Sequence, residues 1–187
     1  DPFVLENSEV IFGPGSIVYG SDAMGGVIDF HSRTISLNQE NGVSTQGNLT
    51  TRYSSSNNEK TGHFDFQMSN GKLGSYTSIS FADFGDQKMG SVGPNEYDRL
   101  FFVQRINGLD EMVLNDNVNN QKHSAYNQLN LMQKIKYQAN DNLTFDYSFY
   151  YTHSSNIPRY DRLIQMNGDH LKYAEYTQNF KKVFLKF

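Results

Sequence analysis

Several residue types and patterns are scarce in this chain of 187 residues, which has no cysteine, no tryptophan and only four prolines. Without cysteine, a disulfide framework, a zinc ribbon and an iron-sulfur cluster are excluded. The uncharged apolar runs are only a few residues long, whereas a membrane-spanning helix needs about 20 mostly apolar residues. The 20 acidic side chains outnumber the 16 basic ones. With no basic run longer than two lysines, nucleic acid is disfavoured as a partner.

Aromatic and turn-forming residues are abundant, with 12 Tyr, 14 Phe and 15 Gly. Aromatic side chains suit a pleated, half-buried surface, and glycine together with Asn, Asp and Ser occupies turns. The composition therefore predicts an all-β protein. No secretory signal begins at Asp1, so we expect that such a signal was removed or that the chain starts within a longer protein.

Apolar and polar residues alternate with a period of two along much of the chain after residue 46. Phe64, Phe66 and Met68 share one strand face. The clearest segment runs from Leu143 to Tyr151, where Leu, Phe and Tyr alternate with mostly polar residues. A membrane-crossing β-strand needs about 9 to 11 residues, longer than the usual strand of a soluble sheet. The pattern favours transmembrane strands.

Six strands are expected, near residues 47–55, 60–69, 73–84, 126–138, 143–153 and 172–187. Tight turns are expected at Asn70–Lys72 and Ala139–Asn142, whereas long connections follow the third and fifth strands. Short turns at one rim and long loops at the other are typical of outer-membrane barrels. Tyr147, Tyr150, Tyr151, Tyr173 and Tyr176 are expected to form an aromatic girdle at the membrane interface.

The first 39 residues differ from the rest, because glycines interrupt short apolar pieces. We expect a separate small α/β or β element over residues 1–39, followed by barrel strands over 40–187. The glycine spacing from Gly20 to Val27 resembles a phosphate loop, but the required Lys and Ser or Thr are absent. Ser16 does not lie in a hydrolase elbow. With no catalytic constellation elsewhere, the sequence predicts no enzyme and no cofactor.

The segment Glu9-Val-Ile-Phe-Gly-Pro-Gly-Ser-Ile-Val-Tyr-Gly-Ser-Asp-Ala-Met-Gly-Gly-Val-Ile-Asp-Phe30 closely resembles the end of the plug domain of TonB-dependent outer-membrane receptors. Its motif residues are Gly13, Pro14, Gly15, Ser16, Tyr19, Gly20, Gly25 and Gly26. Phe12 stands where the family usually has Arg, which puts an ion pair between plug and barrel in doubt. Weaker likeness around Arg52–His63, Tyr126–Leu131 and Pro158–Leu163 points to receptors of the Bacteroidetes type.

The resemblance implies a fold in which an α/β plug fills a transmembrane antiparallel β-barrel of 22 strands. This chain would supply the C-terminal part of the plug and about six barrel strands. The implied function is import of haem, a ferric siderophore or another scarce nutrient across the outer membrane of a Gram-negative bacterium. The implied partners are outer-membrane lipid and the TonB complex, the latter through a segment upstream of Asp1.

Cargo contacts are expected in the long connections, because Arg and Tyr bind anionic or aromatic ligands and His can ligate haem iron. The candidates are Tyr97, Arg99, Arg105, His123, His153, Arg159, Tyr160, Arg162 and His170. Haem is the first expectation for cargo, while the identity of any metal stays open. Two alternatives are a complete outer-membrane barrel of about eight strands with a structural or adhesive role, and a soluble β-sheet binding module.

Overall fold

The computed structural model describes residues 1–13, 16–21, 23, 25–38, 42–158 and 177–186, with the backbone alone at 16, 105, 110, 158 and 177–186. Its main feature is an antiparallel sheet in the order β12-β11-β10-β5-β4-β3. The strands are β3 Ser44–Ser54, β4 Glu59–Ser69, β5 Leu73–Phe84, β10 Tyr126–Asn140, β11 Leu143–Pro158 and β12 Thr177–Lys186. Six strands were expected, and six are found. The predicted start of the last strand, residues 172–176, lies outside the described residues.

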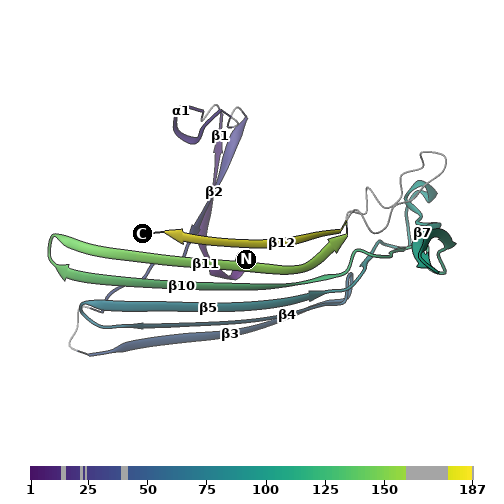
Figure 1. Ribbon diagram of the computed structural model, residues 1–187. Helices are drawn as coiled ribbons and strands as arrows, with labels where there is room; N and C mark the ends of the chain where they lie inside the picture. The colour runs from purple at the N-terminus through teal and green to yellow at the C-terminus, as the bar shows by residue number, and fades with distance from the viewer. Residues whose placement is uncertain (14–15, 22, 24, 39–41, 159–176, 187) are drawn as a thin grey trace.

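Tight turns join β4 to β5 and β10 to β11 at the same end of the sheet (Figure 1). The Asn70 side-chain oxygen accepts the backbone N–H groups of Lys72 at 2.9 Å and Leu73 at 2.7 Å. The Asn140 side-chain oxygen likewise accepts the N–H of Asn142 at 2.9 Å. These local contacts are what suit Asn to turns. The expected rim of short turns is therefore present.

The chain from 85 to 125 leaves the opposite end of the sheet and folds on itself (Figure 1). It contains β6 Gln87–Lys88 paired with β9 Asn120–Gln121, a 3-10 turn at Asn95–Tyr97, and a hairpin of β7 Phe101–Ile106 with β8 Leu109–Leu114. The hairpin turn is Asn107-Gly108, with φ of 52° and 84°. Asn-Gly is the strongest short hairpin signal in a sequence. The prediction of one long connection between the third and fourth strands did not include this hairpin.

The N-terminal region forms a two-stranded antiparallel ribbon that rises away from the large sheet (Figure 1). A 3-10 turn at Pro2–Val4 leads into β1 Leu5–Phe12, a single helical turn α1 Ser16–Tyr19 lies near the tip, and β2 Gly26–Ser32 returns. Gly13 and Gly20 have φ of 96° and 99°, a backbone conformation that favours glycine. The expected boundary between plug and barrel at residue 39 is untested and stays a prediction.

The two faces of the large sheet differ in chemistry and in exposure. We call the face of Phe64 the outer face and that of Asp65 the inner face. Large apolar side chains on the outer face are exposed: Leu49, Phe64, Phe66, Met68, Leu73, Ile79, Phe81, Ile135, Tyr137, Leu143 and Phe145. Polar side chains on the inner face of β4 and β5 are buried: Glu59, Thr61, His63, Asp65, Ser69, Ser78 and Ser80. At β4 and β5 the sheet thus exposes its apolar face and covers its polar one.

The expected aromatic girdle is wrong in one residue. Tyr147 and Tyr151 alternate with Tyr150 along β11 and pair with Ile135 and Leu131. Tyr150 instead faces inward, where its hydroxyl lies 3.0 Å from Ser32 Oγ. Tyr173 and Tyr176 lie outside the described residues.

A small apolar core lies where the N-terminal region crosses the inner face. It joins Val4 and Ile35 to Tyr76 of β5 and Met132 of β10. At the two edges of the sheet, β3 and β12 do not pair with each other within the described chain. The described sheet is therefore open, which gives no support to a closed barrel of eight strands.

Candidate functional site

The candidate site is the contact between the N-terminal region and the inner face. Two short segments make this contact: residues 1–4, before the ribbon, and residues 32–37, after it. They are tied to each other by the Arg33 N–H, which donates to Val4 O at 2.9 Å. Glu6 adds a second tie, since its carboxylate accepts the Thr34 N–H at 3.0 Å and the Thr34 hydroxyl at 2.9 Å. These two hydrogen bonds from Thr34, the hydroxyl first, lower the pKa of Glu6.

The first segment covers a polar cluster centred on His63. His63 Nδ1 lies 2.7 Å from Ser80 Oγ, and Nε2 lies 3.1 Å from Asp65 Oδ2. The Phe3 ring stacks on the imidazole with centroids 4.8 Å apart, and the Arg52 guanidinium lies 5.5 Å from the Phe3 centroid. Buried polar groups of this kind need such partners, because an unpaired one is costly.

Ser80, His63 and Asp65 together resemble the residue types of a hydrolytic triad, so their access matters. Ser80 is 2% exposed and His63 3% exposed. The Ser80 hydroxyl donates to the Asp1 carboxylate, and Phe3 lies over the imidazole. With the nucleophile covered and its proton directed to another carboxylate, the geometry is that of a packing contact.

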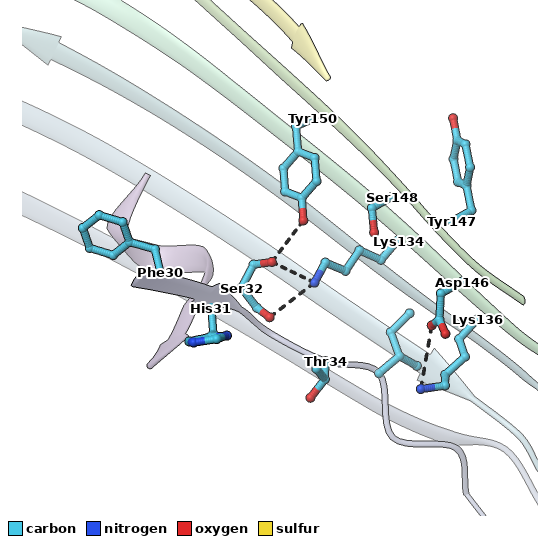
Figure 2. A pocket seen from close by; sticks show the side chains of 11 residues that line it. Phe30, His31, Ser32, Thr34, Lys134, Lys136, Asp146, Tyr147, Ser148 and Tyr150 are labelled. Atoms are coloured by element: carbon cyan, nitrogen blue, oxygen red, sulfur yellow. Dashed lines mark hydrogen bonds and ion pairs between the residues drawn. The ribbon is translucent and has the colours of Figure 1, made fainter. Parts of the chain in front are cut away.

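The second segment is bound by two charged groups of the large sheet, which we call the wall: Lys134 of β10, shown in Figure 2, and Asp65 of β4. Lys134 Nζ donates to Arg33 O at 2.6 Å, to Ser32 Oγ at 2.9 Å and to Ser32 O at 3.3 Å. Arg33 Nη1 lies 3.7 Å from Asp65 Oδ1, which also accepts the Asn48 amide at 3.0 Å. Attachment of this segment thus combines hydrogen bonds, an ion pair and the burial of Ile35.

A pocket of about 340 Å³ lies between this segment and β10–β11 (Figure 2). Its lining is mostly polar or amphipathic: Phe30, His31, Ser32, Thr34, Ile35, Lys134, Lys136, Asp146, Tyr147, Ser148 and Tyr150. Lys136 and Asp146 form an ion pair at 3.7 Å, with the Asp146 side chain 65% exposed. Hydroxyl, ammonium and aromatic groups in one cavity suit a small polar ligand. None of these lining residues is among the site residues predicted from the sequence.

The expected cargo residues are only partly described. The long connection over residues 85–125 contains Tyr97, which is exposed, together with Arg99, Arg105 and His123. The His123 Nε2 lies 2.7 Å from Val103 O, so that nitrogen contacts the backbone of β7 within the β7–β8 hairpin. His153 is on β11, where it pairs with Leu129. Arg159, Tyr160, Arg162 and His170 lie outside the described residues. The roles assigned to all these residues stay predictions.

No group of three or more His, Asp or Glu side chains is arranged to hold a metal ion within the described part of the chain. Of the expected plug motif, Gly13, Gly20, Gly25 and Gly26 belong to the turns and strand start of the ribbon. A Cβ on Gly26 would lie 2.8 Å from Ile11 O, so this close strand pairing requires glycine. Tyr19 ends α1, whose first residue, Ser16, has only its backbone described; Pro14 and Gly15 lie outside the described residues.

Comparison with known proteins gives one partial similarity. The chain is 34% identical over 94 residues to the vitamin B12 transporter BtuB of Vibrio vulnificus strain YJ016. The match spans 50% of this chain and 14% of the transporter. No family model matches the chain, and no solved structure matches it. Among the described residues, no helix is long and apolar enough to cross a membrane. The similarity supports a relationship to TonB-dependent transporters at family level.

Proposed function

We propose that this chain is part of a TonB-dependent transporter of a Gram-negative outer membrane, which binds and imports a small, scarce nutrient. The observation that carries the proposal is the reversed sheet, whose apolar face is exposed while its polar face is buried on the central strands β4 and β5. A sheet in water would gain by covering Phe64, Phe66 and Ile79. In a barrel wall, by contrast, lipid meets the apolar face and the lumen meets the polar one.

The strand lengths support the same proposal. The six strands have 10 to 16 residues, and about 9 to 11 tilted residues cross a bilayer. Gln133 is the polar exception on the outer face of β10. It accepts the Thr77 hydroxyl at 2.6 Å and donates to Ser75 Oγ at 3.0 Å. Its amide is thus provided with partners within the sheet, as a polar group facing hydrocarbon requires.

The N-terminal region fits the role of a plug, because both of its wall-bound segments lie against the inner face. In the proposed barrel, the N-terminal region would therefore lie in the lumen, attached by polar contacts such as those of Lys134 and Arg33. No bond is made or broken in this function. The connection over residues 85–125, at the end opposite the β4–β5 and β10–β11 turns, would face outward and capture cargo.

The cargo class is the finer part of the proposal. The partial similarity to a vitamin B12 transporter favours a corrinoid, whereas His123, in the connection over residues 85–125, favours haem. A ferric siderophore is a third candidate. All three are bulky and scarce, and they differ in charge and in iron content.

The test is uptake by the full-length protein encoded by the source gene. It would be produced in a Gram-negative strain that lacks its own corrinoid and haem receptors, with and without a functional TonB complex. We expect the protein in the outer-membrane fraction and TonB-dependent uptake of labelled cyanocobalamin, or of haemin or a ferric siderophore in parallel assays. A protein found in the soluble fraction would overturn the proposal and favour the β-sheet binding module.

A further inference from the structure

At the end of β2, the main-chain carbonyls of Ser32 and Arg33 accept hydrogen bonds from a group outside the ribbon. Pairing of β1 with β2 ends at Ser32, which is opposite Leu5. The next carbonyl, that of Arg33, lies beyond the ladder. Backbone carbonyls turned toward a covered surface need a donor, because leaving them unpaired costs free energy. Both carbonyls accept from the same group, Lys134 Nζ.

Lys134 uses its full donor capacity in this contact. An ammonium has three protons, and Nζ has three acceptors: Arg33 O, Ser32 O and Ser32 Oγ. The Tyr150 hydroxyl lies 3.0 Å from the same Ser32 Oγ, so β11 joins the contact. In Figure 2 these groups converge on Ser32 from the wall. Hydrogen bonds from a charged donor are stronger than neutral ones.

Lys136 provides an internal comparison on the same strand and the same face. Its Nζ forms an ion pair with Asp146 Oδ1 at 3.7 Å, and the Asp146 side chain is 65% exposed. Exposed pairs of this kind contribute little to stability. The two lysines therefore differ in what they bind: Lys134 binds the backbone of the crossing segment, whereas Lys136 binds a side chain of the wall.

We propose that Lys134 is a positioning residue that fixes the segment from Ser32 to Ile35 on the inner wall. The proposal deepens the proposed function and rests on it, because it takes this segment as the end of a plug domain. It names the group that attaches the segment to the barrel. The attached segment also places Ile35 in the core with Tyr76 and Met132, and it forms one side of the pocket. Without the ammonium, the two carbonyls lose their donor and the segment leaves the wall more often.

Hydrogen exchange of the amides of residues 33–37 tests this proposal in the full-length protein. Lys134→Met keeps the length of the side chain and removes its charge and donors. We expect exchange in this segment to be about ten- to a hundredfold faster, as the loss of hydrogen bonds to a charged group implies. Lys136→Met is the matched control, and its exchange should stay within about twofold of the parent. Unchanged exchange in Lys134→Met, or equal acceleration in both variants, would overturn the proposal.

Chemical rescue separates the ammonium from simple packing at this position. The chain has no cysteine, so Lys134→Cys provides a single thiol once any cysteines elsewhere in the full-length protein are replaced. Alkylation in denaturant with 2-bromoethylamine, followed by refolding, restores an ammonium at nearly the lysine length. Iodoacetamide gives a neutral adduct instead. We expect protection of residues 33–37 to return with the first adduct and not with the second; equal protection with both would contradict a positioning role.

Exchange protection of β4 and β5 shows in every variant whether the wall has folded. If Lys134→Met does not fold, the two adducts of Lys134→Cys provide the comparison. The location of the protein in the cell is a separate result. A protein outside the outer membrane would refute the proposed function, whereas the role of Lys134 is decided by exchange alone.

Discussion

The two faces of the six-stranded sheet differ in the reverse sense from those of a sheet in water. On β4, the side chains of Phe64 and Phe66 are 46% and 40% exposed, whereas those of the adjacent residues His63 and Asp65 are buried. Because neighbouring residues on a strand point to opposite faces, the same backbone carries both environments. Alternation alone therefore predicts only that a strand has one apolar and one polar face. Whether each face meets protein, lipid or water depends on what lies against it in the folded molecule.

The largest expected effect comes from a charge on the outer face. Phe64→Arg places a guanidinium at the middle of β4, and in a bilayer this should cost about 2–4 kcal/mol. On a water-facing sheet, a surface substitution is usually within about 0.5 kcal/mol of neutral. The two media therefore give different results for the same change. Urea unfolding of the full-length protein in phospholipid vesicles measures the cost.

Thr50→Arg is the matched control for this prediction. Thr50 pairs with His63, so it lies on the inner face of β3, and it is exposed. An arginine there meets a polar, accessible surface and should change stability by less than about 1 kcal/mol. If both variants lost equal stability, or if Phe64→Arg were neutral, the outer face would not be a lipid face.

The second prediction compares two glycines, one on each face. An added Cβ at Gly74, on the inner face, would lie 2.3 Å from Ile35 Cγ2. Gly74→Ala should therefore push the crossing segment from the wall, at a cost of about 1–3 kcal/mol. Gly62 lies on the outer face with no heavy atom within 4 Å of the added Cβ.

Gly62→Ala should be stabilising by about 0.5–1 kcal/mol, because glycine within a strand loses more backbone entropy on folding than alanine. Unfolding of the two variants under identical conditions gives the comparison. A cost at Gly62 equal to that at Gly74 would show that both faces are covered by protein. Hydrogen exchange of the amides of residues 33–37 in Gly74→Ala then shows whether the loss of stability is localised to the crossing segment.

The sheet could be predicted from sequence because its information is local. Alternation around Phe64 and around Phe145 gave the strands, and Asn70 and Asn140 gave the turns. The β7–β8 hairpin was equally local, and its Asn107-Gly108 signal was overlooked. Tyr150 was assigned to the girdle although alternation with Tyr151 puts it on the other face.

The candidate site could not be predicted in the same way, because its residues are far apart in sequence. Ser32 and Lys134 meet across 102 positions. Neither residue belongs to a motif, and a lysine among polar residues on a strand looks like an ordinary solvated group. Only the pairing of β10 with β5 and β11, together with the crossing of residues 32–37, brings these groups together. Such contacts depend on topology, which a single sequence does not fix locally.

The smallest expected effect concerns residues 1–4 and 32–37, which cover the inner face. The question is whether these two segments are bonded to each other independently of the large sheet. Thr34 contributes two hydrogen bonds to the Glu6 carboxylate, and these lower the pKa of Glu6. A carboxyl with a lowered folded-state pKa stabilises the fold above its ordinary pKa, and this contribution is lost as the pH falls through the lowered value. Thr34→Val removes the hydroxyl, the larger cause, and should move the Glu6 pKa back toward its ordinary range.

A carboxyl titration followed by NMR, in protein labelled at glutamate, measures this shift, with Thr50→Val as the distant control. Because Glu6 is exposed, the effect on global stability should be slight. Exchange of the 33–37 amides should rise as the pH falls through the Glu6 titration, after correction for intrinsic exchange rates, and this rise should be smaller in Thr34→Val. A Glu6 pKa unchanged by Thr34→Val would mean that the Thr34 hydroxyl does not bind Glu6 in solution, and the tie between the two segments would then rest on the hydrogen bond from the Arg33 N–H to Val4 O.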